Sequence, residues 1–153
     1  MYAIALIVTP LIIFTGLSIW SNFSNPYIGL EEGRLRQCPS SPNCVCSESE
    51  KDDMHFIKPL RVADDSTDFQ EIATQAIRTM GGRIELESAS FIHATFQTPI
   101  FRFKDDLELR FVENRMEIRS ASRVGYSDLG ANRKRVLELQ SRIGDVLSSQ
   151  SAR

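Results

Sequence analysis

The first part of the chain lacks charge: no Asp, Glu, Lys or Arg precedes Glu31. The stretch from Tyr2 to Trp20 is close to the length of about 20 residues that a helix needs to cross the hydrocarbon layer of a membrane. It also lacks the basic start and the small-residue cleavage site of a secretory signal peptide. We therefore expect an uncleaved transmembrane helix that anchors the protein, over residues 1–22.

Other absences narrow the function classes. The formal net charge of -2 gives no long-range attraction for nucleic acid, so we expect no nucleic-acid partner. The chain has no glycine-rich phosphate loop, no C-x-x-C pair and no H-E-x-x-H motif. We accordingly predict no cofactor and no metal. The length of 153 residues suits one domain with a modest core.

The cysteines are few and clustered, at Cys38, Cys44 and Cys46. In an exported protein, Cys38 and Cys44 could close a small disulfide loop and leave Cys46 over. In the cytoplasm all three thiols would stay reduced, and metal binding would compete, although C-x5-C-x-C matches no common zinc spacing. The residues alone leave both alternatives open.

Two signals bear on the compartment of the domain, and they disagree. Arg34 and Arg36 follow the predicted anchor, and basic residues next to a span favour the cytoplasmic side. The cysteine cluster favours an oxidising compartment. We expect a membrane-anchored protein whose folded domain is extracytoplasmic, in the periplasm.

The region after the anchor divides into a linker and a helix. Residues 23–60 are rich in Ser, Asn, Pro and acidic residues without a hydrophobic period, so we predict a linker that contains the cysteine loop. From Asp64 to Met80, apolar residues recur at helical spacing, and Asp68 and Glu71 have the spacing of a capping box. The pair Gly81-Gly82 then ends the predicted helix.

Beyond residue 82 the hydrophobic period changes from 3.6 to 2, which predicts four half-buried strands. Their connections are too short for crossover helices, so the strands should form an antiparallel meander. A last helix is predicted from Leu129 to Leu147, with Val136, Leu139, Ile143 and either Leu147 or Val146 as its apolar stripe. The expected fold is an α+β domain over residues 61–149, with element order α-β-β-β-β-α and both helices on one face, followed by a disordered tail at 150–153. The expected core positions in the strands are Ile84, Leu86, Ile92, Ala94, Phe96, Leu107, Leu109, Phe111, Met116 and Ile118.

The pairing of the last two strands can also be predicted. A loop at Asn114-Arg115 would place Phe111 opposite Ile118 and Arg110 opposite Arg119. The charged residues would then share the outer face of the sheet. We interpret that face as a solvated surface.

Polar side chains concentrate in the corner between the last strand and the last helix. The helix N-terminus offers unpaired N–H groups, and guanidinium forks suit carboxylate or phosphate. The corner therefore predicts an anion-binding site formed by Arg119, Ser120, Ser122, Arg123, Ser127, Asp128, Asn132 and Arg133. The alternative is a structural clamp in which Asp105, Asp106 and Asp128 accept hydrogen bonds from the arginines.

The sequence contains few residues in a recognisable catalytic arrangement. Ser122 or Ser127 could act as the nucleophile of a hydrolase, but the two histidines, His55 and His93, stand in no recognisable motif. We expect His93 on the outer face of the sheet and assign no catalytic residue.

Three stretches resemble a known family. They are CPSSPNCV at residues 38–45, FKDD at 103–106 and RSASRVGYSDLGANRKR at 119–135, and together they resemble the uncharacterised family called domain of unknown function 1499. The resemblance spans about Leu35 to Ile143. It implies an N-terminal membrane segment or export signal and carries no established activity. Cys46 departs from the family pattern, which leads us to expect a small polar residue there.

Three functional hypotheses remain. The first is a membrane-anchored, non-catalytic accessory domain that binds a protein partner or a small anionic ligand at the corner. The second is a hydrolase that uses a serine of the corner. The third is a thiol or metal module at Cys38, Cys44 and Cys46.

Overall fold

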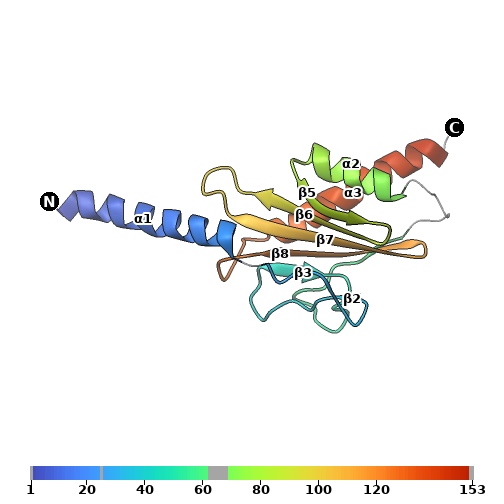
Figure 1. Cartoon of the computed structure of the whole chain (residues 1–153), viewed down its shortest axis with the longest axis horizontal. Helices are drawn as coiled ribbons and strands as arrows, with labels where there is room; N and C mark the ends of the chain where they lie inside the picture. Colours follow the sequence, from blue (N-terminus) through green and yellow to red (C-terminus); the bar gives the residue numbers. More distant parts are fainter. Residues whose placement is uncertain (1, 25, 62–68, 152–153) are drawn as a thin grey trace.

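The structure is a computed structural model, and it describes residues 2–24, 26–61 and 69–151 (Figure 1). Its elements, in chain order, are α1 (Tyr2–Phe23), β1 (Leu30–Glu31), β2 (Arg34–Leu35), β3 (Cys44–Cys46), β4 (Leu60–Arg61), α2 (Phe69–Thr79), β5 (Arg83–Ser88), β6 (Phe91–Gln97), β7 (Lys104–Val112), β8 (Arg115–Ser122) and α3 (Ala131–Ser151).

The main sheet has six antiparallel strands in the order β3-β8-β7-β6-β5, and β4 also pairs with β8. The predicted α+β class is confirmed, but the predicted four-stranded sheet is wrong. Of the two additional strands, β3 lies in the region predicted to be a linker and β4 lies at the end of that region. Strands of two or three residues are too short to show an alternating pattern of apolar and polar residues, so they cannot be predicted from the sequence.

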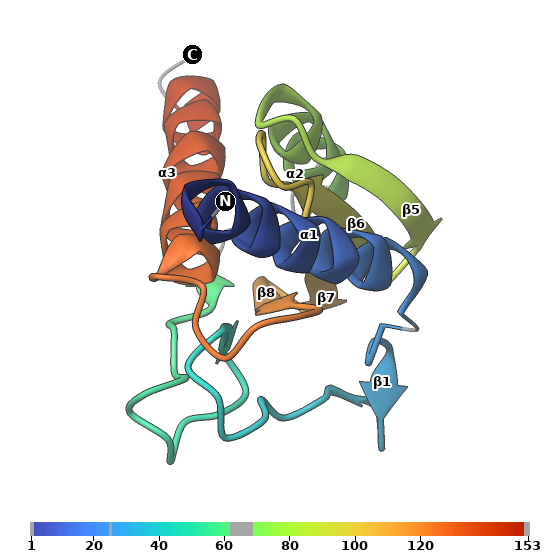
Figure 2. The same cartoon turned by 90° about the vertical axis from the view of Figure 1, so that its left-hand side faces the viewer.

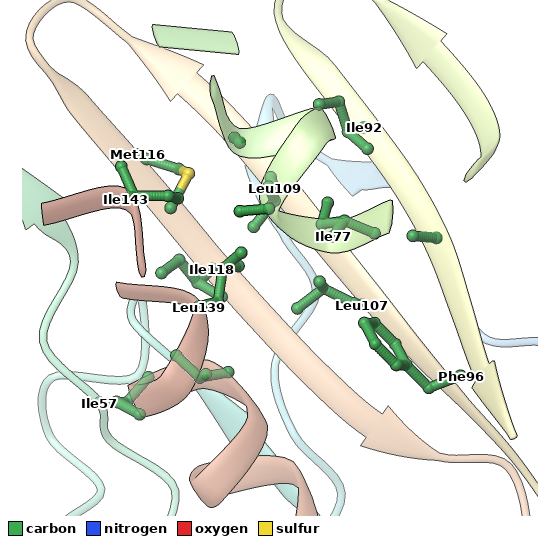
Figure 3. Close-up of a cluster of buried hydrophobic side chains, with 14 of the residues drawn as sticks. Ile57, Ile77, Ile92, Phe96, Leu107, Leu109, Met116, Ile118, Leu139 and Ile143 are labelled. Carbon is green, nitrogen blue, oxygen red and sulfur yellow. The ribbon is translucent and has the colours of Figure 1, made fainter. Parts of the chain in front are cut away.

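Helices α2 and α3 cover one face of the sheet, and the loops before and after β3 cover the other (Figures 1 and 2). On the helical side, Ile77 of α2 and Leu139 and Ile143 of α3 are fully buried against Leu107 and Ile118 (Figure 3). Each such side chain contributes about 1.5–3 kcal/mol on burial. Packing in this hydrophobic core holds β7 and β8 in place, and with them the polar side chains that these strands carry.

The predicted helix stop is present. Helix α2 ends at Thr79, Gly81 takes φ +83, and Gly82 N donates to Ile77 O at 2.9 Å. A Cβ at Gly82 would lie 2.6 Å from Phe96 Cζ, so this position has no space for a side chain. The predicted start at Asp64 and the cap at Asp68 lie outside the described residues.

The predicted membrane-spanning helix is wrong. Helix α1 forms, but within the described residues no helix is both long and apolar enough to cross a membrane. Its last turn carries polar groups that hold it to the sheet. Lys104 N donates to Ser21 Oγ at 2.8 Å, and Asn22 Nδ2 donates to Arg102 O at 3.0 Å. The end of α1 is therefore held against the β6–β7 connection.

The predicted register of β7 and β8 is wrong by two residues. Glu113 takes φ 50 in a tight turn, so Phe111 pairs with Met116 rather than with Ile118. As a result Glu108 stands opposite Arg119, which replaces the predicted pair of like charges by a pair of opposite charges.

The charged face of the sheet is buried and not solvated as predicted. His93, Asp106, Glu108 and Arg119 are all buried there. The cover comes from the segment predicted to be a linker, whose loops before and after β3 run beneath the sheet (Figure 2). This cover turns a charged surface into an interior polar layer.

Helix α3 differs from its prediction at both ends. It begins at Ala131, and Leu129 lies outside it with φ 55. It ends at Ser151, so Gln150 is helical and not part of a disordered tail, while residues 152–153 lie outside the described residues.

Candidate functional site

The alternation of β8 separates the predicted corner into two groups. Ser120 projects toward the helices, where its Oγ donates to Asn132 Oδ1 at 2.6 Å. Arg119 projects to the opposite face, where its Nη1 donates to Glu108 Oε2 at 2.7 Å. Successive side chains of a strand point to opposite faces, so the eight predicted residues do not form one site.

Asn132 is the centre of the group on the helical side. It is fully buried, and its Nδ2 donates to Asn43 O at 3.0 Å and to Ser122 Oγ at 2.9 Å. Its Oδ1 accepts hydrogen bonds from Ser120 and from Arg135 Nη1, the latter at 2.5 Å. These bonds join α3 to β8 and to Asn43, which directly precedes β3. The polar atoms of Asn132 therefore hold these segments together.

Asp105 belongs to the same group. Its Oδ2 accepts a hydrogen bond from Arg135 Nη2 at 2.6 Å, and the Arg135 guanidinium lies 4.7 Å from the centre of the Phe96 ring. Arg135 was not among the predicted site residues. Its position three residues after Asn132 in α3 is the signal that places both side chains on one face of the helix.

The start of α3 is capped by the chain itself. Ser127 Oγ accepts a hydrogen bond from Leu129 N at 3.2 Å, and Asp128 carboxylate oxygens accept from Gly130 N at 3.0 Å and Asn132 N at 2.8 Å. The N–H groups that were expected to cradle an anion are therefore used by the Asp128 carboxylate.

Arg133 lies apart from the other arginines. Its Nη1 donates to Phe56 O at 2.9 Å and its Nη2 donates to Met54 O at 2.8 Å. Arg133 thus ties the N-terminal cover to α3, and the predicted bond to an aspartate is replaced by two bonds to backbone carbonyls.

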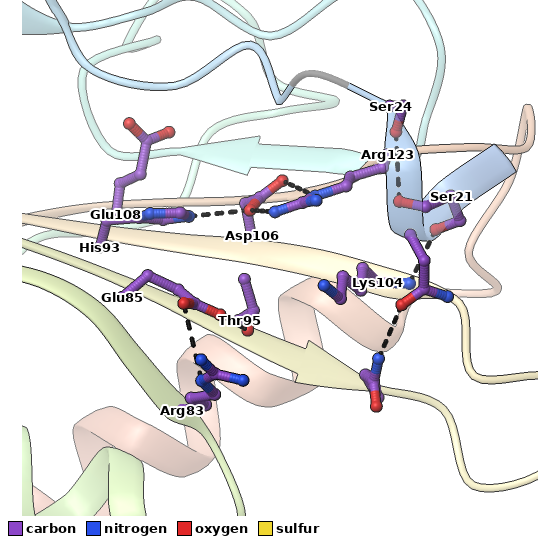
Figure 4. A network of polar contacts seen from close by, with 12 residues as sticks. Ser21, Ser24, Arg83, Glu85, His93, Thr95, Lys104, Asp106, Glu108 and Arg123 are labelled. Atoms are coloured by element: carbon purple, nitrogen blue, oxygen red, sulfur yellow. Dashed lines mark hydrogen bonds and ion pairs between the residues drawn. The ribbon is translucent and has the colours of Figure 1, made fainter. Parts of the chain in front are cut away.

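On the other face, Asp106 joins Arg123 to His93 (Figure 4). Arg123 donates from Nε to Asp106 Oδ2 at 2.9 Å and from Nη2 to Oδ1 at 2.8 Å, and His93 Nε2 lies 2.8 Å from Oδ1. Burial alone would raise the pKa of Asp106. The hydrogen bonds from His93 and Arg123 outweigh it, so the pKa of this carboxyl lies below its ordinary value. The predicted pairing of Asp106 with an arginine of the corner is present.

Arg119 and Glu108 form a second buried pair beside the first. Glu108 is fully buried, and its Oε1 also accepts a hydrogen bond from Gly29 N at 2.6 Å. Burial raises the pKa of Glu108, although the Arg119 guanidinium opposes this effect. The Nε of Arg119 is buried and finds no hydrogen-bond partner among the described residues.

A cavity of about 440 Å³ lies between this face and the N-terminal cover. Its wall combines both arginines with one carboxylate and with residues of the region predicted to be a linker. The lining residues are Pro26, Tyr27, Gln37, Cys38, Pro39, Asp106, Arg119, Ala121, Ser122 and Arg123. A larger hollow of about 540 Å³ separates α2 from α3, but none of its lining residues belongs to the corner.

Of the three cysteines, Cys38 lines this cavity. Cys38 and Cys44 are joined by a disulfide that holds the 38–44 loop to β3, and Cys46 is a free, buried thiol. Burial raises the pKa of Cys46, which disfavours the reactive thiolate. No cluster of three or more metal-ligating side chains occurs in the part of the chain that the structure describes.

The histidines are paired with aspartates. His55 Nδ1 lies 2.5 Å from Asp52 Oδ2, and His93 bonds to Asp106. Within the described residues, neither histidine bonds to Ser122 or Ser127, whose hydroxyls accept bonds from Asn132 and from the backbone. A nucleophile with an adjacent histidine base is thus not assembled at this corner.

Comparison with known proteins places the chain in a family. A family model described as "Protein of unknown function (DUF1499)" matches residues 34–143, which include the cysteine loop, the whole main sheet and most of α3. No curated protein matches the chain. Because the match covers most of the 153 residues, the chain belongs to the family of unknown function DUF1499.

Proposed function

We propose that this protein is a non-catalytic accessory domain that binds a small anionic ligand in the cavity between its sheet and its N-terminal cover. The observation that carries the proposal is that Arg119 and Arg123 meet on the wall of one cavity. They come from the corner that the sequence singles out: Arg119 is in β8, and Arg123 directly follows that strand.

The dimensions of the cavity support a small molecule as the ligand. Its volume of about 440 Å³ falls within the range of about 300–1,000 Å³ that is usual for ligand pockets. Its wall mixes apolar residues with a few polar ones, as in most small-molecule sites. Ala121 and Pro39 provide apolar surface, and Ser122 and Gln37 lie beside it.

The electrostatics of the wall favour a negative ligand. Two guanidinium groups and one carboxylate line the cavity, which leaves one positive charge in excess. Arg123 is held in place by its two bonds to Asp106. Arg119 lies on the same wall, and its Nη1 bonds to Glu108 on the sheet.

The proposal is tested by nuclear magnetic resonance of the full-length chain titrated with a panel of small organic anions. We expect changes in the amide shifts of residues 37–39 and 119–123. Replacing Ala121 by Leu adds a larger side chain to the cavity wall while both arginines are kept, and it should weaken binding at least tenfold.

Ala89→Leu is the matched control, because Ala89 is exposed in the β5–β6 turn. It should bind like the wild type. If no anion shifts these residues, or if Ala121→Leu binds as well as the wild type, the cavity is not the binding site.

A further inference from the structure

We infer, on the basis of the proposed function, that the ligand is a monocarboxylate with a small apolar body. The inference rests on three properties of the cavity. These are its net charge, the shape of its donors and the apolar part of its wall.

The charge of the surroundings matches one negative charge. The wall itself carries two guanidinium groups, those of Arg119 and Arg123, and one carboxylate, that of Asp106. Two further charges contact residues of the wall: the Arg36 guanidinium lies 4.2 Å from the centre of the Tyr27 ring, and Glu108 accepts a hydrogen bond from Arg119. The positive charge of Arg36 and the negative charge of Glu108 cancel, so the cavity and its surroundings keep one positive charge in excess. A dianion such as phosphate would leave an uncompensated charge in a partly buried place, which is unfavourable.

The donors suit a planar carboxylate. A guanidinium presents parallel N–H groups that match the two oxygens of a carboxylate. Arg123 already binds the Asp106 carboxylate in this two-bond manner. Arg119 lies on the same wall and uses Nη1 for Glu108, and its Nε–H remains without a partner among the described residues. We therefore place the ligand carboxylate on the sheet side of the cavity, beside Arg119 and Arg123.

The rest of the wall suits an apolar body. Pro26, Tyr27 and Pro39 line the side of the cavity that belongs to the N-terminal cover, and Ala121 lines the sheet side. The Arg36 guanidinium above the Tyr27 ring holds that ring in place. A small ring or a short alkyl chain attached to the carboxylate would pack between these groups.

The experiment compares phenylacetate, its neutral analogue phenylacetamide and inorganic phosphate, each titrated into the full-length chain and followed by the amide shifts of residues 119–123. We expect phenylacetate to bind at least tenfold more tightly than phenylacetamide and more tightly than phosphate. Binding of phenylacetate should be weakened by Ala121→Leu and unchanged by Ala89→Leu.

Two results would overturn the inference while leaving the proposed function in place. Equal affinity for phenylacetamide would show that the carboxylate is not recognised, and tighter binding of phosphate would show a preference for a dianion. If no compound, including the wider panel of anions, shifts these residues, both the inference and the proposed function fail.

Discussion

Arg119 stands directly opposite Glu108 across the β7–β8 pair, and the two side chains form an ion pair of 2.7 Å that is buried beneath the N-terminal cover. Glu108 also accepts a hydrogen bond from Gly29, which lies 79 residues earlier in the chain. The pair therefore joins the sheet to its cover, and it also positions Arg119 on the cavity wall.

Replacing Arg119 by Met should destabilise the protein by about 3–5 kcal/mol, because it leaves the Glu108 carboxylate buried without its partner. Urea denaturation measures the change. The double variant Arg119→Met/Glu108→Leu should recover part of the loss, since no charge is then left unpaired. Arg142→Ala removes an exposed pair with Glu138 and should cost less than about 1 kcal/mol. An Arg119→Met variant as stable as Arg142→Ala would contradict the buried pair.

Asp106 should make stability depend on acid pH. Its pKa is lower in the folded protein than in the unfolded chain, where it is about 3.9. Its contribution is therefore complete above that value and is lost as the pH falls through the folded pKa. The stability difference between wild type and Asp106→Asn should be steady from about pH 7 to 5 and shrink below about pH 4. Urea denaturation at each pH measures it, and an unchanged difference at pH 3 would refute the role of Asp106.

Asn132→Ala should destabilise the protein by about 3 kcal/mol, because it removes a buried side chain that bonds to Asn43, β8 and Arg135 and leaves their polar atoms unsatisfied. Thermal and urea denaturation measure the loss. Ser127→Ala removes one exposed capping bond and serves as the control, with an expected loss of about 1 kcal/mol or less. Similar losses in the two variants would mean that Asn132 is not the centre of a buried network.

The disulfide should stabilise the fold by about 2 kcal/mol, as chain entropy predicts for a short loop. Cys38 and Cys44 are separated by six positions. Cys38→Ser should lower the stability under oxidising conditions and should abolish the effect of a reductant. In Cys46→Ser the effect of the reductant should persist, because Cys46 is not part of the bond. A reductant that leaves the wild type unchanged would count against the disulfide.

Local periodicity predicted the part of the hydrophobic core that the helices and long strands supply, but not Val45 and Ile57, which come from the region predicted to be a linker. Val136, Leu139 and Ile143 were predicted as the apolar stripe of the last helix, and all three are fully buried. A hydrophobic period of 3.6 or 2 predicts which side chains lie on one face of a helix or strand. The face that carries the apolar side chains is the one that is buried. Leu86 is the exception: a bulge between Ile84 and Leu86 shifts the register, and Leu86 is exposed.

The candidate site was predictable only in part. Arg119 and Arg123 were predicted as site residues, and both line the cavity. The opposite wall, which includes Tyr27 and Gln37, was assigned to a linker and could not be foreseen. Its strands are very short, and its contacts with β7 join residues far apart in the sequence, so no local pattern records them.

The sequence by itself determined which stretches are helices and long strands, where α2 stops, and that the chain resembles the family to which it belongs. Those features depend on the spacing of residues that are close together in the sequence. Only the tertiary structure decided that Glu108 faces Arg119, that the charged face is covered, and that the polar corner is divided between two sides of β8. Those features depend on the geometry of one turn and on contacts between segments that are far apart in the sequence. Local sequence patterns do not predict either of them.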